Sequence, residues 1–163
     1  MKQDRFLTGI IAGVAVLILA AVSLFYIRQN DLDYVSDDTP EGVVHNFVFA
    51  LQQKDYNRAY GYLSDIEGKP SKTNFVSHYT TGYDQAYGLQ ILDSTIFENG
   101  QQGDTAVVEL SISQGGGGPF GSRYSYKESA ELALENGEWK IFRMPYQYWE
   151  WNWYTKDGVP IRP

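Results

Sequence analysis

The sequence predicts an α+β domain that follows an apolar N-terminal helix. Residues 6–27 contain no charged side chain. From Thr39 onwards apolar residues recur at the three- and four-residue spacing of an amphipathic helix, and from about Tyr87 they alternate with polar residues as in a strand. Helices that precede a run of strands are typical of a fold in which helices pack on an antiparallel sheet.

The apolar segment at residues 6–27 has the length of a transmembrane helix. Its 22 residues would extend about 33 Å as a helix, close to the roughly 30 Å thickness of the hydrocarbon core of a bilayer. We therefore expect a single-pass protein of the cell membrane that contacts the lipid bilayer through residues 6–27, as a signal-anchor does. A signal peptide cleaved near Ala20–Ser23 is the alternative.

Charges beside this segment predict its orientation. Lys2 and Arg5 precede it, and basic residues favour the cytoplasmic side of a membrane. Residues 1–5 are therefore expected in the cytoplasm, with residues 28–38 as a polar linker and the following domain extracytoplasmic. The G-x-x-x-G spacing at residues 9–13 permits two helices to approach closely, so a homodimer is one candidate assembly.

Composition excludes several classes of site. The chain has no cysteine, which rules out disulfides, thiolate metal sites and cysteine nucleophiles. Residues 1–28 hold three of the 13 basic and one of the 20 acidic side chains, so the remainder carries a net charge of −9. A domain this acidic repels nucleic acid. His45 and His78 are the only histidines and have no second ligand at metal spacing, so we expect no metal or cofactor.

Three helices are predicted at the start of the domain. The first covers residues 39–54, where Thr39 is suited to the N-cap position and the following proline to the first turn. Asp55 is suited to cap a second helix, which continues to about residue 63, and a third helix is expected at residues 71–79.

Four strands follow, joined by turns. They are predicted at residues 89–97, 105–114, 123–134 and 138–143. Asn136-Gly137 separates the last two strands, and this dipeptide is the strongest short signal for a two-residue hairpin.

Three stretches of the chain resemble the nuclear transport factor 2-like superfamily. They are the first helix with the following Lys54–Tyr60, the strand at Gly103–Leu110 and the hairpin at Glu135–Ile141. The resemblance covers about residues 39–143 and consists of fold features without a catalytic signature. It implies a cone of two or three helices packed on a curved antiparallel sheet around an internal pocket. The domain would then cover residues 39–145, with an aromatic-rich tail at 146–163.

The family includes ketosteroid isomerase-like enzymes, whose chemistry requires a carboxylate base and oxyanion donors in an apolar pocket. Glu128 shares a strand face with Tyr124 and Tyr126, and these three residues together with Tyr60 form the candidate ligand pocket. In the alternative interpretation Glu128 lies at the exposed end of its strand, beyond the core. The motif of those enzymes does not match positions in this sequence, so no catalytic residue is assigned.

The tail places Trp149, Trp151 and Trp153 at a spacing of two residues. In a strand they would share one face. They would cover the domain's own core, form a patch for a protein partner, or contact a membrane interface or a sugar ring. These alternatives stay open.

The predicted function is that of a membrane-tethered, extracytoplasmic binding or assembly domain without catalytic activity. The alternative is a small-molecule-binding protein or a ketosteroid isomerase-like enzyme that uses the pocket of the cone. Fold alone does not decide between them.

Overall fold

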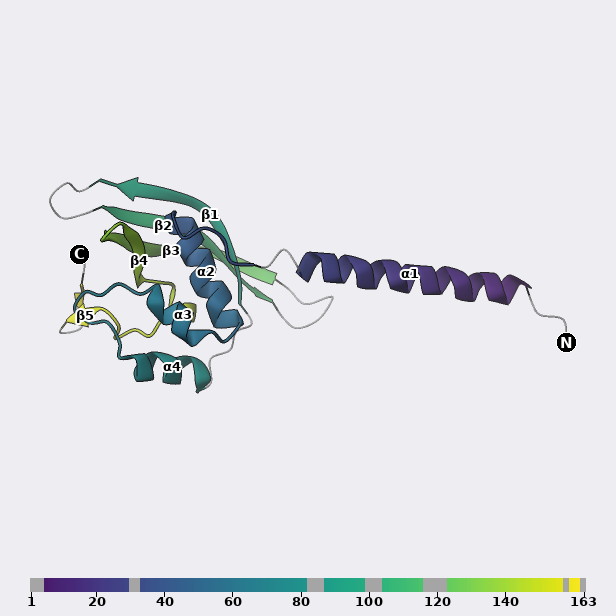
Figure 1. The fold of residues 1–163 in the computed structure, drawn as a ribbon, viewed down its shortest axis with the longest axis horizontal. Coiled ribbons are helices and arrows are strands. Elements are labelled where there is room, and N and C mark those ends of the chain that lie inside the picture. Colours follow the sequence, from purple (N-terminus) through teal and green to yellow (C-terminus); the bar gives the residue numbers. More distant parts are fainter. Residues whose placement is uncertain are drawn as a thin grey trace. The chain divides into compact units, whose positions relative to one another are not determined.

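The structure is a computed structural model, and it forms two compact units, one up to Asp33 and one from Tyr34 onwards. It describes residues 5–29, 33–81, 87–98, 104–115, 123–156 and 159–161. The predicted cytoplasmic segment and part of the predicted linker, residues 1–4 and 30–32, lie outside this description. Figure 1 shows the order of the elements along the chain.

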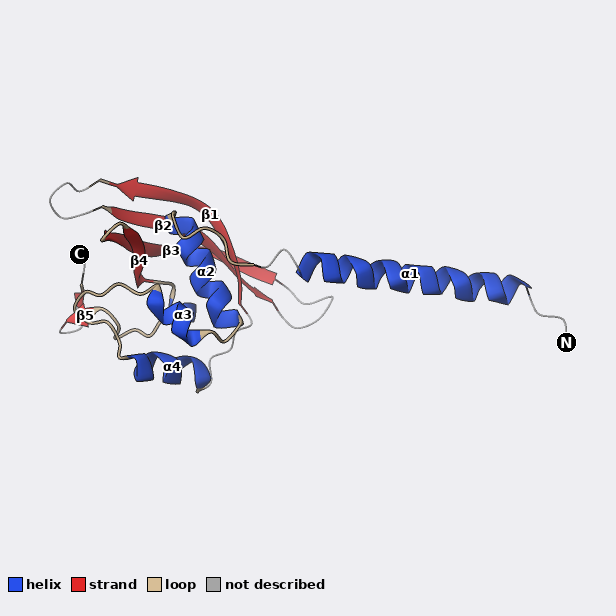
Figure 2. Ribbon diagram, viewed as in Figure 1, coloured by secondary structure: helices blue, strands red, loops and turns tan. Residues whose placement is uncertain are grey.

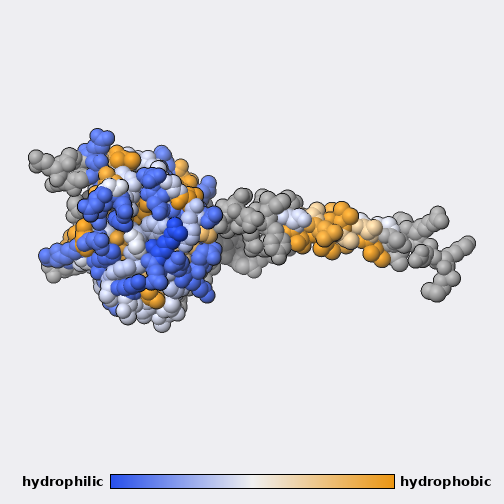
Figure 3. All heavy atoms as spheres, viewed as in Figure 1, coloured by the Kyte–Doolittle hydropathy of each residue, from blue (hydrophilic) through white to orange (hydrophobic). Residues whose placement is uncertain are grey.

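The first unit contains one helix, α1 (Arg5–Gln29). Figure 3 shows hydrophobic residues along its described middle part, whereas the visible face of the second unit is largely hydrophilic.

No helix in the described part of the chain is long and apolar enough to cross a membrane. The prediction of a transmembrane helix at residues 6–27 is therefore wrong. The single-pass location in the cell membrane, with a cytoplasmic N-terminus and an extracytoplasmic domain, rested on that helix and is wrong with it.

The second unit contains a four-stranded antiparallel sheet, and the predicted α+β class is confirmed. Its strands are β1 (Tyr87–Phe97), β2 (Thr105–Gly115), β3 (Arg123–Glu135) and β4 (Glu138–Arg143). They lie in chain order, so each strand pairs with the next. All four predicted strands are present, with ends that differ by two residues or fewer.

The hairpin between β3 and β4 is confirmed at Asn136-Gly137. Both residues have positive φ, 53° and 85°, as a two-residue turn of the type favoured in hairpins requires. The edge of β4 that faces away from β3 is covered by residues 62–64. The Ser64 N–H donates to the Ile141 carbonyl at 2.9 Å, and the Ile141 N–H donates to the Tyr62 carbonyl at 2.8 Å.

Three helices lie on one side of the curved sheet (Figure 2). They are α2 (Pro40–Gln52), α3 (Tyr56–Gly61) and α4 (Lys72–Thr80), and α2 packs directly against the sheet. Each begins with a side-chain cap: Thr39, Asp55 and Ser71 accept hydrogen bonds from backbone N–H groups in the first turn. The three predicted helices are confirmed, although the second ends two residues earlier than expected.

The core lies between α2 and the sheet. The largest fully buried side chains include Phe47 and Leu51 of α2, Leu110 and Ile112 of β2, and Leu132 of β3. The strand residues alternate along the chain as the two-residue pattern predicts.

The aromatic tail does not continue the sheet. After β4 a short 3-10 helix, η2 (Tyr146–Tyr148), is followed by turns and by a two-residue pairing between β5 (Thr155–Lys156) and β6 (Val159–Pro160). The tail is held against the helices by two buried hydrogen bonds. Tyr79 Oη donates to the Tyr148 carbonyl, and Tyr154 Oη donates to the Ser64 carbonyl, each at 2.6 Å.

Candidate functional site

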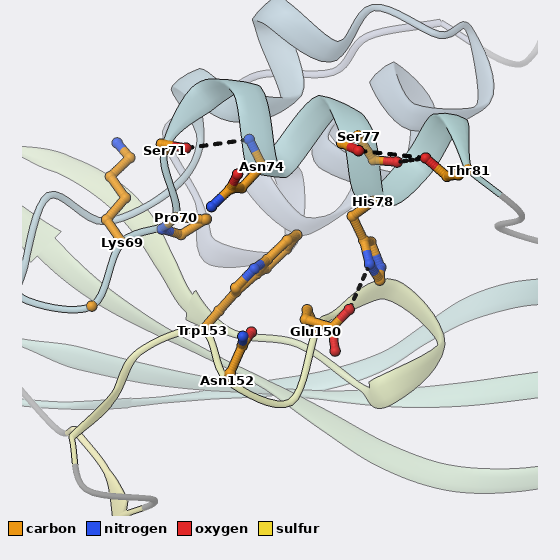
Figure 4. Close-up of a pocket in the computed structure, with 11 residues that line it drawn as sticks. Lys69, Pro70, Ser71, Asn74, Ser77, His78, Thr81, Glu150, Asn152 and Trp153 are labelled. Carbon is orange, nitrogen blue, oxygen red and sulfur yellow. Dashed lines mark hydrogen bonds and ion pairs between the residues drawn. The ribbon is translucent and has the colours of Figure 1, made fainter.

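An open groove of about 630 Å³ lies between α4 and the tail (Figure 4). Its lining is mostly polar and comes from the loop before α4, from one face of α4 and from the tail. The lining residues are Gly68, Lys69, Pro70, Ser71, Asn74, Ser77, His78, Thr81, Glu150, Asn152 and Trp153.

Helical spacing positions the first wall. Asn74, Ser77, His78 and Thr81 are separated by three, one and three residues, which places them on the same face of a helix. The Ser71 hydroxyl accepts the backbone N–H of Asn74 at 3.3 Å and so begins this helix at the edge of the groove.

The tail forms the second wall through alternate residues. Glu150 and Asn152 line the polar groove, whereas Trp149 and Trp151 line a second cavity of about 190 Å³. Trp153 borders both cavities. One short segment therefore presents polar side chains to one cavity and aromatic side chains to the other.

The second cavity is lined mainly by aromatic and other apolar side chains. Trp149 and Trp153 are each 7% exposed and Tyr154 is 2% exposed, whereas Trp151 is 80% and Tyr146 is 72% exposed. The three tryptophans thus border one cavity but differ in exposure. Because the tail folds as a 3-10 helix and turns rather than as a strand, two of them enter the core and the third faces solvent.

A contact between a histidine and a carboxylate joins the two walls of the polar groove. His78 Nδ1 lies 2.9 Å from Glu150 Oε2 (Figure 4). The imidazole also packs edge-on against Trp153, with ring centroids 5.1 Å apart, and against Tyr79 at 4.8 Å. These contacts connect α4 to the tail and orient the histidine ring.

The lysine at the end of the groove is also paired. Lys69 Nζ lies 2.6 Å from Asp65 Oδ1 and donates to the Leu63 carbonyl at 3.1 Å. The hydrogen bond from Lys69 lowers the pKa of the Asp65 carboxyl. The ammonium also lies 4.7 Å from the centre of the Tyr60 ring. Charges in the groove are thus balanced by neighbours within the chain.

Two amide side chains face the groove from opposite walls. Asn74 projects from α4 and Asn152 from the tail, with Trp153 between them (Figure 4). Among the described residues neither side-chain amide forms a hydrogen bond, because the bonds to the Ser71 and Thr155 hydroxyls use the backbone N–H of Asn74 and the backbone carbonyl of Asn152. Each side-chain amide therefore has donors and an acceptor left for a ligand.

The sequence-predicted pocket residues lie elsewhere. On β3, Tyr126 pairs with Ile112 and Glu128 with Leu110, so both share the sheet face that carries the buried β2 residues. Glu128 is half-buried. The ring centroids of Tyr124 and Tyr126 lie 5.7 Å apart. The structure thus places these three predicted residues together on one strand face.

Tyr60 belongs to a different cluster. Its hydroxyl donates to the Pro70 carbonyl at 2.9 Å, and its ring packs edge-on against Phe75 of α4, with centroids 5.4 Å apart. Tyr126 contacts the tail rather than Tyr60. Gln147 Nε2 of the tail donates to the Tyr126 hydroxyl, and Gln147 is 3% exposed.

Tail side chains occupy part of the interior that the predicted cone assigns to a pocket. Trp149 lies edge-on to Phe47 of α2, with centroids 6.3 Å apart, and Trp153 stacks on Phe75 of α4 at 5.5 Å. In this region the aromatic residues that cover the helices belong to the chain itself.

Apart from Trp153, the groove residues were missed from sequence, although two signals were present. The spacing of Asn74, Ser77, His78 and Thr81 forms a polar stripe on the third predicted helix, and polar and aromatic residues alternate in the tail. The helix residues and the tail residues form one groove only if the tail packs against α4, and no local sequence pattern indicates that contact. Among the residues that the structure describes, no cluster of three His, Asp or Glu side chains is arranged to hold a metal ion.

Comparison with known proteins found no protein-family model that matches the chain and no curated protein that matches its sequence. The resemblance to the nuclear transport factor 2-like superfamily therefore stays a prediction.

Proposed function

We propose that the unit from Tyr34 onwards is a binding domain without catalytic activity, and that the groove between α4 and the tail holds a small, uncharged polar ligand. The observation that carries this proposal is the pair of amide side chains, Asn74 and Asn152, on opposite walls of a groove of about 630 Å³. Amides in such positions fix the orientation of a ligand through paired hydrogen bonds.

The ionisable side chains of the groove have partners within the chain. His78 contacts Glu150, and Lys69 contacts Asp65. Glu128, the carboxylate considered as a base, lies on β3 and does not line this groove.

The architecture supports a nuclear transport factor 2-like fold as part of the same proposal. Three helices precede four antiparallel strands in the chain and lie on one side of a curved sheet (Figure 1). This is the order and layering that the resemblance implies.

A protein partner at the aromatic surface is the second candidate function. Trp151 is 80% exposed and Tyr146 is 72% exposed beside the smaller cavity, and Trp and Tyr are enriched at the energetic centres of protein interfaces. In this case Trp151→Ala abolishes co-purification of a partner, whereas Asn74→Ala does not.

A ligand screen tests the principal proposal. The full-length chain is screened by thermal shift against a library of uncharged polar compounds, and the hits are repeated with Asn74→Ala, Asn152→Ala and, as the matched control, Asn57→Ala. Asn57 is exposed on α3 and does not line the groove. We expect hits that stabilise the wild type and the control but neither groove variant. Hits that stabilise all four proteins equally, or no hits at all, contradict the proposal.

A further inference from the structure

We infer that the ligand of the groove is an uncharged oligosaccharide, with one sugar unit between Asn74 and Asn152 and a neighbouring unit stacked on Trp151. This inference rests on the proposed function and names its ligand class. It is carried by three features of the described residues: the charge balance of the groove, its hydrogen-bonding groups and an exposed aromatic ring in the adjoining cavity.

Charge indicates a neutral ligand. The ionisable side chains of the groove already have partners within the chain, because His78 contacts Glu150 and Lys69 contacts Asp65. Beyond residue 28 the chain carries a net charge of −9, which repels anionic ligands such as nucleic acids and acidic polysaccharides. A cationic ligand would have to compete with His78 for the Glu150 carboxylate.

Hydrogen-bonding groups in the groove fit a ligand rich in hydroxyls. The side-chain amides of Asn74 and Asn152 each offer donors and an acceptor, and Ser77 adds a hydroxyl. Neighbouring hydroxyl groups on a sugar ring both donate and accept, so an amide can engage two of them at once. Purely apolar or purely accepting ligands would leave part of this set unpaired at a cost.

An aromatic ring in the adjoining cavity offers the apolar contact that a sugar ring also requires. Trp151 is the chain neighbour of Asn152, so their Cα atoms are about 3.8 Å apart, and Trp151 is 80% exposed. A sugar ring has an apolar face of C–H groups that packs on an indole. Trp151 lines the second cavity, which adjoins the groove at Trp153, so a ligand that extends from Asn152 past Trp153 reaches Trp151.

The polarity of the groove argues against an apolar peptide anchor at this place. Trp153, the one aromatic side chain that lines the groove, is only 7% exposed. Peptide recognition usually draws most of its affinity from a few well-buried apolar or aromatic contacts. A peptide is therefore treated as an outcome of the experiment below.

Titration with defined sugars tests the inference. The full-length chain is titrated with uncharged tetrasaccharides of glucose, N-acetylglucosamine, mannose and xylose, and binding is followed by calorimetry and tryptophan fluorescence. We expect at least one of them to bind, and Trp151→Ala and Asn74→Ala each to weaken that binding by about tenfold or more. Phe97→Ala is the matched control, because Phe97 is a 48% exposed aromatic residue that lines neither cavity; it should bind like the wild type.

The outcomes separate this inference from the function on which it rests. If none of the four tetrasaccharides binds at millimolar concentration, or if Trp151→Ala binds as tightly as the wild type, the carbohydrate inference is overturned. Library hits that still depend on Asn74 and Asn152 would then leave the proposed binding function in place. A synthetic peptide that requires both Asn74 and Trp151, in the absence of sugar binding, would also overturn the inference and assign the groove to a peptide.

Discussion

At the scale of single residues, Gly68 connects the loop before α4 to the tail. Its φ is +88°, a conformation that residues with a Cβ rarely adopt, and its carbonyl accepts the Tyr154 N–H at 2.9 Å. A Cβ added here would lie 2.8 Å from the Tyr154 Cα. Both the backbone conformation and the close approach therefore require glycine.

Replacing this glycine should loosen the tail. We expect Gly68→Ala to lower the free energy of unfolding by about 1–3 kcal/mol, since the variant must strain its backbone or move Tyr154 away. Urea denaturation followed by tryptophan fluorescence measures the change. Gly61→Ala is the control, because a Cβ at the end of α3 meets nothing within 4 Å; it should be neutral or stabilising. Equal losses in both variants would contradict this account of Gly68.

Tyr154 makes the stability of the domain sensitive to alkaline pH. Burial raises the pKa of its hydroxyl above the ordinary range, with the nearby Glu135 and Asp65 carboxylates acting in the same direction. The folded pKa is thus higher than the unfolded value of about 10. The associated stability is fully present below about pH 10 and is lost as the pH rises towards the folded pKa.

We therefore expect the free energy of unfolding to fall above about pH 10, and Tyr154→Phe to reduce that fall. The phenylalanine variant also loses the hydrogen bond to the Ser64 carbonyl, so its stability at neutral pH should be lower. Denaturation curves at several pH values provide the measurement, with Tyr124→Phe as an exposed control. A fall of equal slope in Tyr154→Phe and the wild type would exclude Tyr154 as its source.

At the scale of elements, the tail divides into core and surface positions. Trp149 and Trp153 are buried against α2 and α4, whereas Trp151 faces solvent. The same chemical change should therefore have unequal effects at positions that are only two residues apart.

Alanine substitution measures this difference. Trp149→Ala and Trp153→Ala should each cost about 3–5 kcal/mol, because each leaves a cavity in an aromatic core. Trp151→Ala should change stability by less than about 0.5 kcal/mol. Thermal unfolding of the three variants is sufficient to compare them. A loss at Trp151 comparable to that at Trp149 would mean that its ring is packed rather than exposed.

The helices and strands were predictable from sequence because their signals are local. Thr39 and Asp55 cap the helices that they were expected to cap, and Asn136-Gly137 turns the hairpin. The conformation of the tail was not predictable in this way. Its tryptophan spacing is compatible with a strand, but contacts with Phe47 and Phe75 favour a 3-10 helix followed by turns.

At the scale of the whole molecule, the position of the groove depends on packing between segments that are far apart in the sequence. The groove combines residues of α4 with residues of the tail that lie about 70 positions later in the chain, and no periodic pattern links such distant segments. Glu128 was chosen as a candidate because the two-residue alternation of its strand assigned it to a face with Tyr124 and Tyr126, yet the groove lies elsewhere. The apolar composition of residues 6–27 likewise suggested a membrane span that the described helix does not provide.

The position of the tail has a consequence for how the domain folds. Its two buried hydrogen bonds join residues separated by 69 and 90 positions, so each closes a long loop and requires a large loss of chain entropy before it forms. The helices and the β3–β4 hairpin can form earlier, because their contacts are local. Until the tail docks, Phe47 and Phe75 lack the tryptophans that cover them, and the nascent domain passes through a stage in which aromatic surface is open to aggregation or to chaperones.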